Sequence, residues 1–218
     1  MTPNPDRRNL VRLSLLAAVA ANSLSLRTAC ANHPGLLESA AAPDPSVHDF
    51  DLFFGSWRTR HRRLKERLAD NTEWTEFDGT STMHRLLGGY GNLDDNVFYL
   101  PGGTYRGVSL RAFDPGSKRW AIWWLDGRAP HTLDAPVIGR FENGVGTFLG
   151  DDTLRGKPIK VRYQWSRITS TSRQWEQAFS PDGGKNWETN WITQFTRTGP
   201  SHAEETVAAA PGCFRLVL

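Results

Sequence analysis

The chain has 218 residues, among them nine Trp and eleven Phe, which supply enough apolar surface for one all-β domain of ordinary size without disulfides. Residues 1–31 hold four of the 26 Lys and Arg residues and one of the 23 Asp and Glu residues, so 22 residues of each sign remain after them. A neutral remainder lacks the surplus of positive charge that phosphate binding needs, and we expect no nucleic acid as partner.

The first 31 residues predict an export signal. Arg7-Arg8 precedes an apolar run at residues 13–21 that is too short to span a bilayer, a pattern typical of a twin-arginine signal. Ala29-Cys30-Ala31 supplies a small-x-small cleavage site. We therefore expect a mature protein that is periplasmic or extracellular and not inserted in a membrane. A lipoprotein acylated at Cys30 is the alternative, and in either case Cys213 has no partner, so no intrachain disulfide is expected.

Low-complexity segments flank the predicted domain. Residues 32–47 are rich in Ala, Pro and Gly, which predicts a linker, and residues 199–218 form a second such tail. The folded unit is therefore expected over residues 48–198.

Within that unit nearly every segment alternates apolar and polar residues with a period of two, and turn signals recur at short spacing. Asp114-Pro115-Gly116 and Asn143-Gly144 have the dihedral preferences of hairpin turns. The pattern predicts an all-β antiparallel meander of about ten strands, closed into a barrel that leaves no exposed edge. A two-sheet sandwich is the alternative, because hairpin spacing does not distinguish closure from stacking. The expected strands cover residues 56–64, 73–83, 95–100, 105–113, 119–126, 137–141, 145–149, 159–165, 173–179 and 187–197.

The stretch Gly55-Ser56-Trp57 predicts how the barrel closes. Gly55 permits a tight turn into the first strand, and the Trp57 ring plugs one end. The last strand would return beside the first and place the Arg197 guanidinium over that ring as a structural brace. This combination resembles the Gly-x-Trp signature and C-terminal Arg of the calycins, the superfamily of lipocalins and fatty-acid-binding proteins, and implies a calycin-like β-barrel.

Further motifs resemble a bacterial family of unknown function, the DUF1579-type proteins, which are grouped with the calycins. The similarity covers residues 48–198, the whole predicted domain. It implies the barrel fold and carries no agreed activity and no catalytic residues. The motifs are Gly55-Ser56-Trp57, His61-Arg62-Arg63-Leu64, Leu87-Gly88-Gly89-Tyr90-Gly91-Asn92, Tyr105-Arg106-Gly107, Phe113-Asp114-Pro115, Trp123-Trp124-Leu125-Asp126 and Trp175-Glu176-Gln177-Ala178-Phe179-Ser180.

Strand parity predicts which side chains face the interior. If Trp57 points inward, then His61 and Arg63 do so too, and we assume that Glu76 shares the inner face. Inward polar residues are informative because each needs a partner or a ligand. The candidate ligand-binding residues are His61, Glu76, Arg111, Trp124, Asp126, Trp165, Gln177 and Trp191.

An interior this aromatic is either a solid core or the wall of a cavity, since barrels of eight to ten strands are near the size at which a cavity opens. In the last strand Trp187, Trp191 and Phe195 are expected on the inner face. An ion pair from Arg111 to Asp126 or Glu76 that braces the barrel is the alternative to a polar clamp on a ligand head group.

The function expected from these features is an exported, non-enzymatic binding barrel that holds a small apolar or amphipathic molecule. One alternative is a haem-binding barrel that uses His61 or another His. A second is a small isomerase or cyclase with His61 or Glu76 as general base. A third is a partner-binding or structural barrel with a filled core.

Other chemistry has little support in the sequence. His61, His84 and His131 lack the spacing of a zinc site, and we expect no metal and, apart from the haem alternative, no cofactor. Asp94-Asp95 is expected in a solvated turn rather than a calcium loop. No Gly-x-Ser-x-Gly motif is present, and the Gly-rich residues 87–91 are expected to form a barrel corner or a flexible portal.

Overall fold

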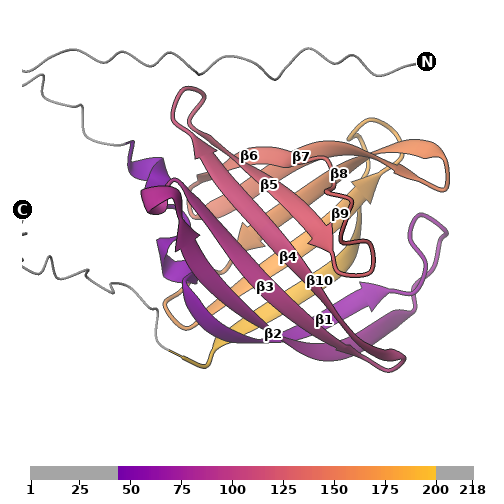
Figure 1. The fold of residues 1–218 in the computed structure, drawn as a ribbon. Helices are drawn as coiled ribbons and strands as arrows, with labels where there is room; N and C mark the ends of the chain where they lie inside the picture. The colour runs from indigo at the N-terminus through magenta and orange to yellow at the C-terminus, as the bar shows by residue number, and fades with distance from the viewer. Residues whose placement is uncertain (1–43, 200–218) are drawn as a thin grey trace, which may run out of the picture. The chain divides into compact units, whose positions relative to one another are not determined.

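The structure is a computed structural model that describes residues 44–199. The predictions for residues 1–31, for Cys30 and Cys213 and for the C-terminal tail lie outside these residues. The described part forms ten antiparallel strands closed into one barrel (Figure 1). The all-β barrel is therefore confirmed, and the sandwich is wrong.

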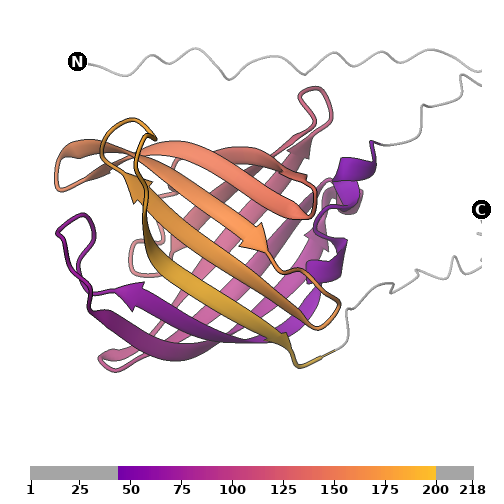
Figure 2. The ribbon, with the colours of Figure 1, turned by 180° about the vertical axis from the view of Figure 1, so that it is seen from behind.

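Each strand pairs with its neighbours in sequence, and the last strand closes the ring against the first. Figure 2 shows the same barrel from behind, where the C-terminal strand lies beside the N-terminal one. The strands are β1 (Gly55–Leu64), β2 (Trp74–Leu86), β3 (Gly91–Leu100), β4 (Gly103–Asp114), β5 (Arg119–Asp126), β6 (Val137–Glu142), β7 (Val145–Leu154), β8 (Lys157–Ser166), β9 (Ser172–Ser180) and β10 (Glu188–Arg197), and the short 3₁₀ helices are η1 (Pro45–His48), η2 (Asp51–Phe53) and η3 (Leu87–Gly89).

The turns explain why the strands end where they do. Asn143 and Gly144 both have positive φ, at 51° and 77°, as the primed hairpin turn predicted between β6 and β7 requires. The Gly-rich residues 87–91 form η3 and the corner between β2 and β3. At that corner the Phe113 backbone N–H donates to the Tyr90 carbonyl oxygen at 2.8 Å, which ties the turn to β4.

One end of the barrel is closed by η1 and η2 (Figure 1). The Phe50 ring centroid lies 5.0 Å from that of Trp120, and the Phe53 centroid lies 4.9 Å from that of Trp165. Val47 is buried in the same cluster. Residues 45–47, which the sequence analysis assigned to the linker, therefore belong to the folded unit, because their apolar side chain completes the core of the closed end.

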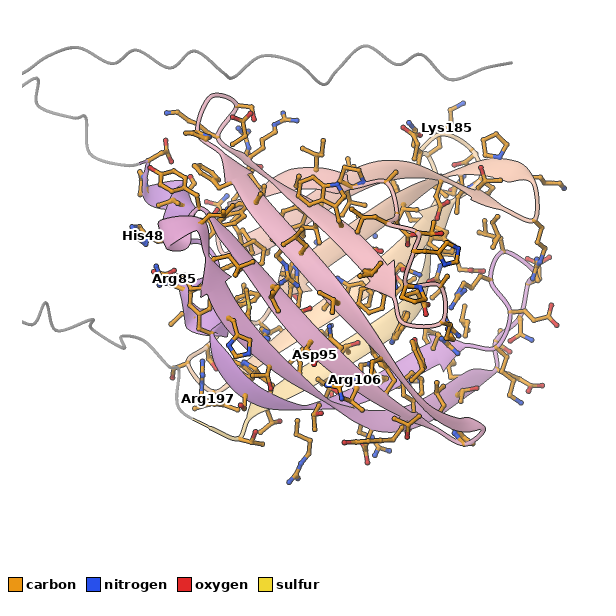
Figure 3. All side chains as sticks on the ribbon, in the orientation of Figure 1. His48, Arg85, Asp95, Arg106, Lys185 and Arg197 are labelled. Carbon is orange, nitrogen blue, oxygen red and sulfur yellow. The ribbon has the colours of Figure 1, made fainter. Side chains whose placement is uncertain are left out.

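The predicted brace at this end is confirmed. Gly55 has a φ of 105°, and Trp57 is 1% exposed with its indole N–H donating to the Phe53 carbonyl oxygen at 2.8 Å. Register pairs Trp57 with Arg197, whose guanidinium carbon lies 4.1 Å from the centroid of the ring. Arg197, labelled in Figure 3, also donates to the carbonyl oxygens of Ser170, Phe54 and Leu52 at 2.6 to 2.7 Å.

The opposite end carries the loops that follow the odd-numbered strands (Figures 1 and 2). The wall is least complete between β5 and β6, where only residues 120–122 and 137–139 pair. Residues 127–136 cross this gap, and the Asp134 backbone N–H donates to the Trp124 carbonyl oxygen at 3.0 Å. We call this the open end of the barrel. Within residues 44–199, no helix has the length and apolar character needed to cross a membrane.

Candidate functional site

A cavity of about 230 Å³ lies inside the barrel and reaches toward the open end. A cavity of about 150 Å³ is enough to hold benzene, so this one has room for a larger aromatic molecule. Ten aromatic side chains form much of its wall, and polar or charged side chains make up about half of the lining residues. The aromatic lining residues are Phe98, Tyr105, Trp123, Trp124, Tyr163, Trp165, Trp175, Phe179, Trp191 and Phe195.

Seven of the eight predicted site residues line this cavity, namely His61, Arg111, Trp124, Asp126, Trp165, Gln177 and Trp191. The eighth, Glu76, is a wrong prediction, because its carboxylate faces solvent on the outside of β2. There it pairs with Arg60 at 2.8 Å and with Arg62 at 3.3 Å. Register places Phe77 opposite His61, so the inward set of β2 has odd numbers.

His61 is held by three side chains inside the barrel. Its Nε2 lies 2.8 Å from the Thr59 hydroxyl, and its Nδ1 lies 2.9 Å from the Thr193 hydroxyl. The Trp191 indole N–H also donates to Nδ1 at 3.3 Å. Since indole only donates, we assign the proton of the neutral ring to Nε2. Burial, with a smaller contribution from the Arg63 charge, lowers the pKa of His61 to about 3, so the ring stays neutral.

The position of His61 depends on a glycine of the neighbouring strand. A Cβ atom at Gly79 would lie 2.4 Å from the Val97 carbonyl oxygen and 2.7 Å from the Thr59 hydroxyl. It would also lie 3.1 Å from Nε2 of His61. Gly79 therefore leaves the space in which the ring and its hydroxyl partner meet, and the His61 ring stacks on Phe77 at 4.7 Å.

Arg111 lies between His61 and the closed end and forms a buried ion pair, as one of the two alternatives from the sequence predicted. Its partner is Asp94, however, and not Asp126 or Glu76. Its guanidinium donates to the Asp94 carboxylate at 2.6 Å and to the Asn92 side-chain oxygen at 3.1 Å. Asn96 and the Ser109 backbone N–H donate to the second carboxylate oxygen. Burial opposes ionisation of Asp94, but the Arg111 charge and these hydrogen bonds outweigh it and lower the pKa of the carboxyl.

The prediction that Asp94-Asp95 forms a solvated turn is wrong, because both residues belong to β3 and face opposite sides of the sheet. Asp95 points outward with Arg106 on β4, and both are labelled in Figure 3. Asn92, Asp94 and Asn96 alternate with the period of a strand. That alternation was the signal from which sequence reasoning could have placed a polar face inside.

Among the lining side chains that are almost completely buried, two donors are unused by the described residues. They are Nε of Arg111 and Nε1 of Trp165, whose side chains are 2% and 3% exposed. The Arg111 guanidinium carbon lies 5.8 Å from the centroid of the Trp165 ring, so the two groups are neighbours. Buried donors without acceptors are costly, and an acceptor on a bound molecule or an ordered water would satisfy them.

Arg173 is a buried charge that the sequence analysis missed. It is 3% exposed, and its guanidinium carbon lies 3.8 Å from the centroid of Trp57 and 4.4 Å from those of Phe53 and Phe195. Burial holds its pKa well below the usual range for Arg. The period-two set that contains Trp175 and Gln177 continues back to residue 173, so strand parity was the available signal.

The remaining candidates divide between the interior and the open end. The Gln177 amide N–H donates to the buried Asn190 side-chain oxygen at 2.8 Å. Asp126 lies at the open end and pairs with Arg128 at 2.5 Å.

The prediction that Trp187 faces the interior is wrong, since Trp187 precedes β10 and lies under the outward Arg162 guanidinium at 4.7 Å. A bulge between Thr189 and Trp191 explains the error, because it interrupts the strict alternation along β10.

The fold and the cavity define the class of this protein as a closed ten-stranded antiparallel barrel with an aromatic interior. No family model matches the chain. No curated protein matches it either. The resemblance to DUF1579-type proteins therefore stays a prediction.

Three solved structures are similar in fold. The S-type phycobiliprotein lyase CPES from Guillardia theta is 13% identical, with 71% of this chain and 94% of that chain covered and a TM-score of 0.48. EF1p2_mFAP2b bound to DFHBI is 12% identical over 70% of this chain and 99% of that chain, with a TM-score of 0.36. A DUF3598-family protein of unknown function from Nostoc punctiforme is 8% identical over 71% and 100%, with a TM-score of 0.20.

Proposed function

We propose that this protein is an exported, non-enzymatic binding barrel that holds a small apolar or amphipathic molecule in its cavity. The observation that carries the proposal is the cavity of about 230 Å³ between the Arg111 layer and the open end. Its aromatic walls, together with convergent polar groups such as His61, Arg111 and Gln177, are suited to a small molecule that is partly apolar and partly polar. Export is proposed from residues 1–31 alone.

The geometry of the histidine favours binding over catalysis. Both ring nitrogens of His61 are hydrogen-bonded to neighbouring side chains, and its pKa is far below neutrality. A general base needs a free nitrogen and a pKa near the working pH. The other base considered, Glu76, lies on the outer face. A haem iron would have to displace one of the hydrogen-bond partners of His61 to bind a nitrogen of this ring, which disfavours His61 as a haem ligand.

The test is a titration with N-phenyl-1-naphthylamine, a neutral dye whose fluorescence rises in an apolar site. Wild type should bind one dye per chain. Ser109→Phe should abolish binding, because Ser109 lines the cavity and the new ring would fill it. Thr80→Phe is the matched control, since Thr80 is exposed on β2, and it should bind like wild type.

Circular dichroism melts accompany both variants, so that loss of binding is separated from loss of fold. Absence of dye binding to wild type, or unchanged binding by a folded Ser109→Phe variant, would contradict the proposed function. In that case the interior is a filled structural core.

A further inference from the structure

Two arginines at the open end have no acidic partner among the described residues. Arg63 points inward at the end of β1, and Arg67 lies in the loop that follows. Neither forms an ion pair within residues 44–199, whereas the outward arginines Arg60 and Arg62 of the same strand do. Both unpaired side chains are half-buried and line the cavity.

The surroundings of these arginines make an anion the natural partner. Nε of Arg67 is buried and has no acceptor in the described structure. Burial, followed by the charge of Arg63, lowers the pKa of Arg67 against the opposing charge of Glu188, which forms no ion pair with it and accepts the Leu68 backbone N–H at 2.8 Å. The guanidinium still stays protonated at any working pH. Two cations that repel one another are stabilised by an anionic group placed between them, and guanidinium binds carboxylate with charge-assisted hydrogen bonds.

Acidic residues on the other side of the opening fix where the anion goes. Asp126, Asp134 and Asp152 line the cavity from β5, from residues 127–136 and from β7. Asp126 is neutralised by Arg128, but Asp134 and Asp152 have no basic partner within residues 44–199. In the ring order β7 lies four strands from β1, across the barrel. An acidic group is therefore repelled from the β5–β7 side and attracted to Arg63 and Arg67.

The aromatic wall indicates the shape of the rest of the molecule. The Arg63 guanidinium carbon lies 5.1 Å from the centroid of Trp191, which itself lies 5.7 Å from those of Phe98 and Trp175. Trp191 meets these two rings at 58° and 79°, so faces and edges surround the space below Arg63 from several directions. A rigid flat ring system matches such walls with little loss of conformational freedom.

We infer that the ligand is a flat aromatic carboxylate or similar aromatic anion, with its ring in the cavity and its acidic group between Arg63 and Arg67. This inference rests on the proposed function and adds the chemical class of the ligand and its orientation. No bond is made or broken in the binding.

The probes are 2-naphthoate and its neutral isostere 2-naphthamide, each titrated directly by calorimetry. Wild type should bind naphthoate about tenfold more tightly than naphthamide, since only the carboxylate is held by charge-assisted hydrogen bonds. Arg63→Gln and Arg67→Gln should each bring the ratio of naphthoate to naphthamide affinity from about ten close to one. Arg58→Gln is the matched control, because Arg58 is exposed on the outer face of β1 and should keep the preference.

A variant that removes an acidic charge, and so should have the opposite effect on naphthoate binding, tests the inference without changing the arginines. Asp134→Asn removes a repelling charge and should raise the ratio of naphthoate to naphthamide affinity about two- to threefold. Raising the salt concentration to 0.5 M should weaken only naphthoate. If Arg63→Gln fails to fold, Arg67→Gln and Asp134→Asn still decide the question.

The outcomes separate the two proposals. If neither probe binds wild type, the proposed function fails and the inference fails with it. If both probes bind with equal affinity, or if Arg67→Gln and Asp134→Asn leave the preference unchanged, the cavity binds small molecules but the anionic class is wrong.

Discussion

At the scale of single residues, the interior is organised by charges that burial makes expensive. Asp94 and Arg111 are almost completely excluded from water, and each is stable there because the other neutralises it. Asn92, Asn96 and the Ser109 backbone satisfy most of their remaining hydrogen-bonding groups. The pair forms a polar layer between the apolar closed end and the aromatic cavity, and this layer fixes the lower limit of the space open to a ligand.

The first prediction concerns that pair. Arg111→Met should destabilise the barrel by roughly 3 to 5 kcal/mol, because it leaves the Asp94 carboxylate buried without a counter-charge. The double variant Arg111→Met/Asp94→Leu should lose clearly less than the sum of the two single losses, since no unpaired charge remains. Urea unfolding of the four proteins measures this. Strictly additive losses would show that the two side chains do not stabilise one another.

The second prediction is a pH dependence that His61 causes. The folded pKa of about 3 lies below the ordinary value near 6.5, so below pH 6.5 the unfolded chain takes up a proton that the folded ring does not. His61 therefore contributes stability above pH 6.5 that is lost as the pH falls toward 3. Between pH 6.5 and pH 5 the loss is about 2 kcal/mol.

His61→Gln removes the titrating group and keeps a side chain that can donate and accept hydrogen bonds. The variant should lose about 2 kcal/mol less than wild type between pH 6.5 and pH 5. Denaturant unfolding at the two pH values gives the comparison. Equal losses would mean that His61 titrates normally and is not held neutral by its surroundings.

Residue parity predicted most of the site and failed where the register could not be derived. The inward position of His61 was predicted from that of Trp57 by counting residues along one strand, and the structure confirms it. Glu76 required the register between β1 and β2, and a shift of one residue exchanges the two faces of a strand. The large apolar residues of β2 do not agree on one face, since Trp74 and Leu86 have even numbers and Phe77 and Met83 odd ones. The small inward residues Gly79 and Ser81 gave no contrast with the outward threonines.

At the scale of secondary structure, closure depends on the pairing of the first strand with the last. Arg197 of β10 covers the Trp57 ring of β1 and donates to three carbonyl groups near the start of β1 and in the β8–β9 turn. Arg173 of β9 contacts the same ring. The aromatic ring at the closed end thus joins three neighbouring strands, and the cation contacts add to its burial.

The third prediction follows from this contact. Trp57→Ala should cost roughly 3 to 5 kcal/mol, because it removes a fully buried ring from the closed end. Arg197→Ala should cost about 0.5 to 2 kcal/mol, and the double variant should lose less than the sum. Chemical denaturation of the double-mutant cycle tests this. The control is Arg58→Ala on the outer face of β1, where no coupling to Trp57 is expected.

At the scale of the whole molecule, the alternation and turn spacing were sufficient to predict an all-β meander of ten strands. They did not reveal how the closed end is filled. Phe53 lies in the short 3₁₀ helix η2 and Phe50 immediately before it, where apolar residues have no strand period. Val47 lies in a segment whose Ala and Pro content is typical of linkers. Such local patterns do not predict that Phe50 and Phe53 fill the closed end, because this packing depends on tertiary contacts with Trp120 and Trp165.

The sequence also left cavity and filled core as alternatives, for a physical reason. The free volume depends on close approaches such as that of Gly107, where a Cβ atom would lie 2.2 Å from the Trp124 ring. It depends equally on which way each large ring turns, and strand parity gives only the face. A bound ligand could therefore be inferred only from the positions of the aromatic rings and of the buried donors, which the structure provides.

The last prediction concerns where the molecule acts. Residues 1–31 carry the surplus positive charge of the chain, with an arginine pair ahead of a short apolar run and a small-x-small site at residues 29–31, all outside the described structure. Signal peptidase cleavage there would leave a mature chain that begins near Asn32, twelve residues before the described structure starts at residue 44. Cleavage would then leave every residue of the barrel in place. N-terminal sequencing of protein recovered outside the cytoplasm measures this. Replacing Arg7 and Arg8 together by Lys should trap the uncleaved chain inside the cell, and an external protein that still begins at Met1 would contradict the export prediction.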